Sequence, residues 1–262
     1  MIKVWLAGAG VLGPGLPDSI AARDILLGVA PYADTPDPEP VPALLPANER
    51  RRASIPARWA LTVGSEALAR SGLAAQDVAI VFTSCGGDGM ITDQLCRALA
   101  SSPPEMSPTR FHNSVHNAPA GYWSIFARSR APSTTLCGYD ASFAAGLLEA
   151  AAQATVERRP VLLVAYDLTS PEPLHSLWPV PRPFAAALVL TPEAAGSPGV
   201  RLDIGIAEGN AGPAWPAVLP AQLAANPAAQ ALVLLAAVAK KTRARAGLRY
   251  LRNSHVAIEI DP

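Results

Sequence analysis

The thiol of Cys137 is the most obvious candidate for chemistry in this sequence. It lies in the stretch LCGYDASFAAG, at the end of an apolar run and ahead of small residues that predict a helix from Ala141. A thiol becomes nucleophilic when a helix N-terminus or a neighbouring histidine lowers its pKa. The expected helix would supply the first, and His112 or His116 the second. The pattern is equally typical of an inert core cysteine, so both interpretations stay open.

His112 and His116 are four residues apart in FHNSVHN, a spacing that places two imidazoles on one face of a helix for a metal ion. The Asn and Ser residues around them are turn formers, and no third ligand lies nearby in the sequence. We therefore expect no metal site. The imidazoles are instead expected to bond to the backbone or to line an interface.

Two glycine-rich stretches are candidates for a cofactor site. Gly8–Gly13, GAGVLG, fits the dinucleotide-binding pattern, but Pro14 and Pro17 prevent a helix from continuing after it. A structural turn from strand to loop is the expectation there. Ser84–Gly89, SCGGDG, lacks the Lys and Ser/Thr of a nucleotide loop and predicts a tight turn. The sequence predicts no bound cofactor.

The charge pattern gives no reason to expect a nucleic-acid partner. The 21 basic and 21 acidic residues balance, and no basic stripe stands out. Arg51–Arg52 is expected in a solvated loop and Lys240–Arg245 on a solvated helix face.

The cysteine usage and apolar runs indicate a cytoplasmic location. The three cysteines form neither a CxxC pair nor an even disulfide set, which fits a reducing compartment. The N-terminus lacks the pattern of a signal peptide. The longest apolar run, Ala228–Ala239, is too short to span a bilayer, so no membrane insertion is expected.

The elements that position these residues follow from hydrophobic periodicity and from Pro and Gly breaks. Strands are expected at Ile2–Ala7, Val78–Thr83, Ser133–Leu136, Val161–Ala165 and Val256–Ile260, with Ala185–Leu190 and Arg201–Ile206 as an antiparallel pair. Helices are expected at Ser19–Leu27, Ala57–Ser71, Ile91–Leu99, Gly121–Arg128, Ala141–Glu157 and Gln222–Lys240. The proline-rich residues 31–48 and 170–183 predict loops, and 101–116 a polar crossing segment. The alternation predicts an α/β protein with a mostly parallel central sheet.

The segment from Ser107 to Ala151, followed by VLLVAYD, resembles the N-terminal half of a β-ketoacyl synthase. Asn117 and Gly121 match the family's Asn-x-x-Ala-Gly motif, Ala131–Pro132 stands for its Gly-Pro, and RPFAAALVL resembles its Arg-Pro-Phe-Asp segment. The resemblance covers about residues 1–192 and implies a thiolase-like layered fold. Residues 193–262 would be a truncated C-terminal half that packs on the same sheet in a single compact unit.

Two departures from the family argue against independent catalysis. Counting within the elbow segment places the nucleophile position at Gly138 rather than Cys137. The family takes two further histidines from its C-terminal half, and His175 and His255 do not match them. The resemblance therefore implies a degenerate elbow with no catalytic residue.

A synthase-like chain without its catalytic set resembles a chain-length factor, here of the aryl polyene or xanthomonadin type. Such a subunit pairs with an active β-ketoacyl synthase in a heterodimer and shapes the acyl tunnel in polyketide or fatty-acid-like biosynthesis. The edge strand Ser133–Leu136 would join the two sheets. The side chains expected to meet the partner or narrow the tunnel are Phe111, His112, His116, Asn117, Tyr122, Trp123 and Tyr139. Contact with an acyl carrier protein stays open.

Two alternatives remain. The first is a small acyltransferase or thioesterase-like enzyme that uses Cys137 with His112 or His116 as the base. The second is a pathway scaffold that binds a carrier protein or enzymes without shaping a tunnel.

Overall fold

A computed structural model describes the chain except for residues 41, 43–44, 194–198 and 211–214. The eight strands of the described residues form one sheet in the order β3-β2-β4-β5-β1-β6-β8-β7. Their bounds are β1 (Ile2–Leu12), β2 (Ala79–Thr83), β3 (Ser133–Leu136), β4 (Val161–Asp167), β5 (Phe184–Thr191), β6 (Val200–Glu208), β7 (Ala244–Leu251) and β8 (Ser254–Asp261).

The sheet is mixed, so the expectation of a mostly parallel sheet is wrong. Only β3, β2 and β4 run parallel to one another, and every other pairing is antiparallel. The expected pairing of β5 with β6 is also wrong, because β1 lies between them and is antiparallel to both. Every residue of β5 is buried, which requires a neighbouring strand on each side and a covered face above and below.

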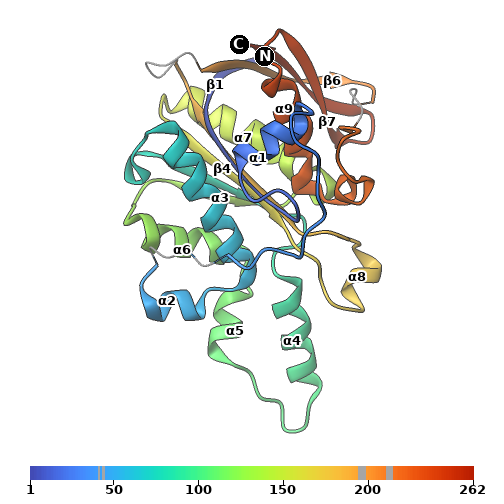
Figure 1. Cartoon of the computed structure of the whole chain (residues 1–262). Helices are drawn as coiled ribbons and strands as arrows, with labels where there is room; N and C mark the ends of the chain where they lie inside the picture. The colour runs from blue at the N-terminus through green and yellow to red at the C-terminus, as the bar shows by residue number, and fades with distance from the viewer. Residues whose placement is uncertain (41, 43–44, 194–198, 211–214) are drawn as a thin grey trace.

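Helices cover both faces of the sheet (Figure 1). Helix α3 (Ile55–Ser71), with α6 (Ala118–Ala127) beside it, lies on one face. Helices α7 (Ser142–Val156), α9 (Gln230–Ala239) and α1 (Ser19–Leu26) belong to the core of the other face. Side chains along β4 alternate between these two cores, so both faces of the strand are buried. This explains why its sequence is a continuous apolar run.

Gly8 and Gly10 of GAGVLG lie within β1, and the turn expected over this stretch begins only at its last residue, Gly13. A Cβ added at Gly8 would lie 2.2 Å from the carbonyl oxygen of Ala67, and one at Gly10 would lie 2.1 Å from that of Val63. These glycines allow the backbone of α3 to approach the strand closely. The chain turns only afterwards, through paired backbone bonds between Gly13 and Leu16.

Helix α4 (Gly89–Ala100) and helix α5 (Pro108–Asn113) form an arm that projects from the body of the molecule (Figure 1). The segment 101–116 was expected to be an irregular crossing, but it contains α5. Pro108 occupies the first helical turn, and the Ser107 hydroxyl accepts from the Arg110 backbone N–H. A proline at this position favours a helix start because no backbone donor is lost.

The C-terminal segment departs furthest from expectation. Helix α9 begins at Gln230 rather than Gln222, because Asn226 and Pro227 divide the segment into the 3-10 turns η3 (Ala221–Ala225) and η4 (Pro227–Ala229). The Lys240–Arg245 stretch is not a helix face, since β7 begins at Ala244. The buried side chains of β7 alternate along the strand, at Ala246 and Leu248.

Four shorter elements complete the described chain. Arg51 and Arg52 end helix α2 (Ala47–Arg52) rather than lying in a loop. The expected loop 170–183 contains the single turn α8 (Leu174–Leu177). The 3-10 turns η1 (Ala75–Asp77) and η2 (Tyr139–Ala141) precede β2 and α7.

Candidate functional site at the carboxyl ends of the parallel strands

The carboxyl ends of β2, β3 and β4 bring together Cys85, Cys137 and Asp167. The Cys137 thiol donates to the carbonyl oxygen of Cys85 at 2.9 Å. Cys85 is buried, and this burial, followed by the charge of Asp167, raises the pKa of its thiol. Cys137 is exposed. The more shielded thiol is thus held in its neutral form, and the accessible one is bonded to a backbone carbonyl.

His116 lies beside the elbow and bonds to the backbone ahead of the cysteine. Its Nε2 is 3.2 Å from the carbonyl oxygen of Leu136, which can only accept, so Nε2 carries the proton. Its Nδ1 faces Gly87, where an added Cβ would lie 3.1 Å away. The imidazole of His112 is on the arm, next to Asn113 and edge-on to Tyr122. In the described chain, neither histidine hydrogen-bonds to Cys137, so a Cys–His pair is not assembled.

The described residues contain no group of three or more His, Cys, Asp or Glu side chains that could hold a metal ion. They also contain no helix whose length and apolar character would allow it to cross a bilayer.

Asp167 is the buried centre of this site, and the sequence analysis did not single it out. Its Oδ1 accepts from the Ser84 hydroxyl at 2.9 Å and from the Cys85 N–H at 2.7 Å, and its Oδ2 accepts from the Ala228 N–H at 3.0 Å. Complete burial raises its pKa to about 6, against these hydrogen bonds, which lower it. Asn226 donates to the Asp167 carbonyl at 2.9 Å. A single acidic residue therefore joins the loop after β2, the end of β4 and η4.

A sequence signal for Asp167 does exist. It ends the run VLLVAYD, in which every residue is buried. A carboxylate at the end of a strand covered on both faces must find hydrogen-bond donors, because an unpaired buried charge is costly. The donors come from segments distant in the sequence, and the periodicity of β4 cannot identify them.

The elbow between β3 and α7 has its left-handed residue at Tyr139. Tyr139 has a φ of +57°, whereas Gly138 has −127°. The Ser142 hydroxyl accepts from the Gly138 N–H at 3.1 Å and donates to the Tyr139 carbonyl at 2.6 Å. The left-handed conformation therefore lies one residue beyond Gly138, the nucleophile position expected from the sequence. The ring of Tyr139 is exposed and packs on Trp178, with centroids 4.6 Å apart.

The aromatic and polar residues expected at a partner surface divide into two groups. Phe111, His112, Asn117 and Tyr139 are exposed, and His116 is half-buried. Tyr122 and Trp123 are 3% and 0% exposed and fill the chain's own core. The expectation that their side chains face a partner does not fit this placement.

The packing of α6 explains the burial of Tyr122 and Trp123. Trp123 packs against Phe126 and Phe82, with centroids 5.3 and 6.4 Å apart. The Tyr122 hydroxyl donates to Asn113, whose own amide donates to the Arg52 carbonyl. Aromatic rings on α6 are thus used to hold α3, α5 and the sheet together.

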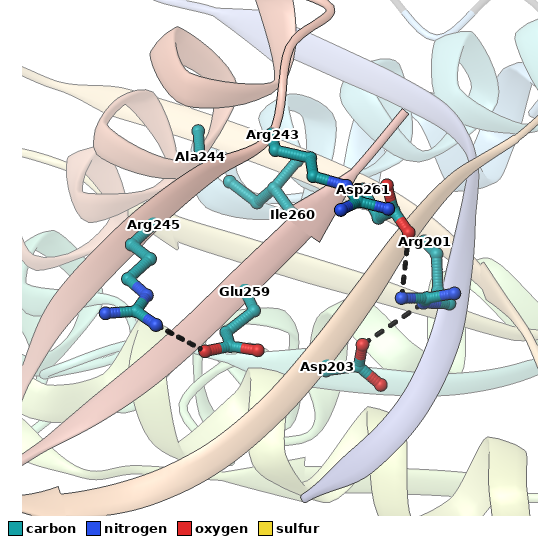
Figure 2. A pocket seen from close by; sticks show the side chains of 8 residues that line it. All are labelled: Arg201, Asp203, Arg243, Ala244, Arg245, Glu259, Ile260 and Asp261. Carbon is teal, nitrogen blue, oxygen red and sulfur yellow. Dashed lines mark hydrogen bonds and ion pairs between the residues drawn. The ribbon is translucent and has the colours of Figure 1, made fainter.

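A surface hollow on β6, β8 and β7 carries many charges (Figure 2). It lies at the opposite end of the sheet from β3. Its lining residues are Arg201, Asp203, Arg243, Ala244, Arg245, Glu259, Ile260 and Asp261. Each carboxylate there is ion-paired with an arginine at 2.8 to 3.1 Å. Exposed pairs of this kind contribute little stability each, and the hollow has no unpaired acid or base for chemistry.

The fold and site define a member of the β-ketoacyl synthase family. The family model described as "Beta-ketoacyl synthase, N-terminal domain" matches residues 29–247, which is most of the chain, and the chain belongs to this family. The match begins later and continues further than the expected span of 1–192, so it includes α9 and part of β7. A search of curated proteins found no match.

Solved structures confirm the thiolase-like layered fold, and three are similar along almost the whole chain. A chain of the ketosynthase ApeO in complex with its chain length factor ApeC, from Xenorhabdus doucetiae, is 24% identical with a TM-score of 0.75, and the match covers 99% of this chain and 100% of that one. A chain of AntDE:AntF, a type II polyketide synthase acyl-carrier protein in complex with its ketosynthase, is 14% identical with a TM-score of 0.76 and 99% coverage of both chains. A chain of the ishigamide ketosynthase/chain length factor is 12% identical with a TM-score of 0.73 and 99% coverage of both.

Proposed function

We propose that this chain is a non-catalytic chain-length-factor subunit that pairs with an active β-ketoacyl synthase and shapes its acyl tunnel. The observation that carries the proposal is the elbow. Its one accessible thiol, Cys137, is bonded to a backbone carbonyl, and in the described structure neither His112 nor His116 hydrogen-bonds to it. Nucleophilic catalysis needs a base within hydrogen-bond reach of the nucleophile. The similarity in fold to chains of ketosynthase/chain length factor complexes supports the same conclusion.

The strand β3 is the proposed joint between the two subunits. It pairs with β2 on one side, and none of the described strands pairs with its other side. Its residues, Ser133 to Leu136, are uncharged and only partly covered. An uncharged open edge presents unpaired N–H and C=O groups to which another strand can add. We therefore place a strand of the synthase along this edge.

The α4–α5 arm supplies the apolar part of the proposed interface. Large apolar side chains are exposed along it and beside it, at Met90, Leu99, Met106, Phe111, Val115 and Ile125. An exposed apolar surface of this kind is typical of a protein interface. Its proposed occupant is the synthase, since the arm leaves the body near the end of β2, the strand beside β3 (Figure 1).

The setting of the reaction is part of the proposal. We expect the subunit to act in the cytoplasm, in polyene, polyketide or fatty-acid-like synthesis of the aryl polyene type. The acyl chain would reach the synthase on an acyl carrier protein. The similar complexes whose names include a chain length factor or an acyl-carrier protein support this setting.

Co-expression with an active synthase tests the proposal. We expect a one-to-one complex by size exclusion, condensation of acyl and malonyl thioesters only when both chains are present, and no effect of Cys137→Ala on the rate. The matched variant replaces the nucleophilic cysteine of the synthase by Ala and should abolish condensation.

Two outcomes would contradict the proposal. If the chain alone turned over acyl thioesters and lost this activity with Cys137→Ala, it would be a cysteine-dependent acyltransferase or thioesterase. If it bound the synthase but left the length of the products unchanged, it would be a scaffold.

A further inference from the structure

The apex of the elbow is an unusual place for a tyrosine. At a φ of +57°, the Cβ of any residue other than Gly crowds the backbone, and the crowding is worst for bulky residues. In enzymes with a nucleophile elbow, the reactive side chain lies on such a strained turn between strand and helix, which exposes it. Tyr139 occupies this position in the turn from β3 to α7, and its side chain is 56% exposed.

The ring of Trp178 packs against the ring of Tyr139. The two ring planes meet at 31°, with centroids 4.6 Å apart. The indole Nε1 of Trp178 is buried and has no hydrogen-bond partner in the described structure. An unpaired buried donor is unfavourable, so this placement of the indole carries a cost that hydrogen bonding does not offset.

Trp178 also forms a wall of a small cavity of about 80 Å³ at the carboxyl ends of β2 and β4. The other walls include Cys85, Gly86, Gly87 and Asp167. The glycines leave backbone rather than side chains along one side. Trp178 lines this cavity and Tyr139 does not, so the indole stands between the cavity and the ring of Tyr139.

We propose that Tyr139 occupies the nucleophile position of the elbow and, stacked on Trp178, closes the cavity to the acyl chain that the synthase extends. This inference rests on the proposed function. The pair limits the length of the acyl chain, because removal of the indole opens this wall of the cavity and removal of the Tyr139 ring takes away the group that packs the indole in place.

Core packing does not account for this arrangement. A ring that is more than half exposed gains little from burial, and it does not offset the strain at Tyr139. The structure retains a second cost beside it, the unpaired Nε1 of Trp178. Strain that is kept where packing does not require it is typical of functional positions.

The backbone part of the proposal is tested by comparing Tyr139→Gly with Tyr139→Ala in the complex with the synthase. Both variants remove the ring, but only Gly relieves the left-handed conformation. We expect the Gly variant to melt about 2–8 °C above the Ala variant, from the cost of a left-handed residue and the usual slope of Tm with stability. An Ala variant as stable as the Gly variant, or more stable, would overturn the apex assignment, since Ala is the more stable residue at ordinary positions.

The closing role is tested by the length of the products made by the same complexes. We expect Tyr139→Gly and Trp178→Ala to shift the distribution to longer chains, with Tyr139→Phe as the control that keeps the ring and the distribution. An unchanged distribution in both ring-removing variants, from complexes that still form and condense, would overturn the closing role alone. Failure of the unaltered chain to form a complex would instead contradict the proposed function.

Discussion

Replacement of the buried acid Asp167 should change how the stability of the protein depends on pH. Burial raises the pKa of Asp167 from its ordinary value of 3.8 to about 6. A difference of one in pKa between the folded and unfolded states corresponds to about 1.4 kcal/mol of stability. Ionisation of Asp167 therefore costs the folded state about 3 kcal/mol at neutral pH.

The sign follows from which form the fold prefers. Because the folded state binds the proton of Asp167 more tightly than the unfolded chain, the contribution of this group to stability is greatest below about pH 4. That contribution falls as the pH rises from about 4 to about 6, and it is constant above about pH 6. Asp167→Asn cannot ionise and resembles the protonated acid, since its amide also places a donor among the N–H groups of Cys85 and Ala228.

The assay is urea unfolding of the wild-type and Asp167→Asn proteins at pH 4 and pH 7.5. We expect the free energy of unfolding of the variant, relative to wild type, to rise by about 2 to 3 kcal/mol between pH 4 and pH 7.5, since the unfolded chain is already partly ionised at pH 4. Asp37→Asn removes the same charge from an exposed position in the proline-rich loop and serves as the control. A difference that stays within about 0.5 kcal/mol, or that falls with pH, would mean that the hydrogen bonds outweigh the burial of the charge.

Three further results are expected. Gly10→Ala should lower the free energy of unfolding by about 3 kcal/mol or more in urea titrations, because the new Cβ would lie 2.1 Å from the carbonyl oxygen of Val63. The control is Gly121→Ala, where the new Cβ has open space around it. Similar losses of stability in the two variants would contradict the close approach of α3 to β1. Phe111→Glu should weaken binding to the synthase about tenfold or more in a titration. The control Leu251→Glu changes a similarly exposed apolar residue on β7 and should leave binding unchanged. Equal effects of the two variants would show that the arm is not part of the interface. Iodoacetamide should label Cys85 more slowly than Cys96 or Cys137, since only Cys85 is buried, and fast labelling of Cys85 by mass spectrometry would contradict this order.

Local pattern predicted most of the elements but not their arrangement. The strand Ser133–Leu136 has the expected bounds, and α1 and α3 differ from expectation by one or two residues at an end. The extension of β1 through Gly8 and Gly10 was missed because glycines usually indicate turns, and here they serve contact with α3. Position in the sheet depends on long-range pairing, which is why the place of β1 between β5 and β6 could not be predicted from periodicity.

The candidate site was predicted in part. Cys137 does lie at the turn from a strand to a helix, and Phe111, His112 and Tyr139 are exposed as interface residues would be. Burial of Tyr122 and Trp123 follows from the packing of α6, which residue type alone does not reveal, since aromatic rings suit cores and interfaces equally. Asp167 and Trp178 were missed because their importance arises from contacts with distant segments.

The two outer strands of the sheet differ in charge, and the difference sets a limit on assembly. The strand β7 carries charged side chains, with Arg243 just before it and Arg245 and Arg249 along it, and charged side chains on an edge strand disfavour the addition of another strand. The strand β3 has no such barrier. If a strand of the synthase adds along β3 as proposed, a sheet whose other edge disfavours addition grows by a single step. The proposed heterodimer is then a closed unit rather than the first two members of a filament.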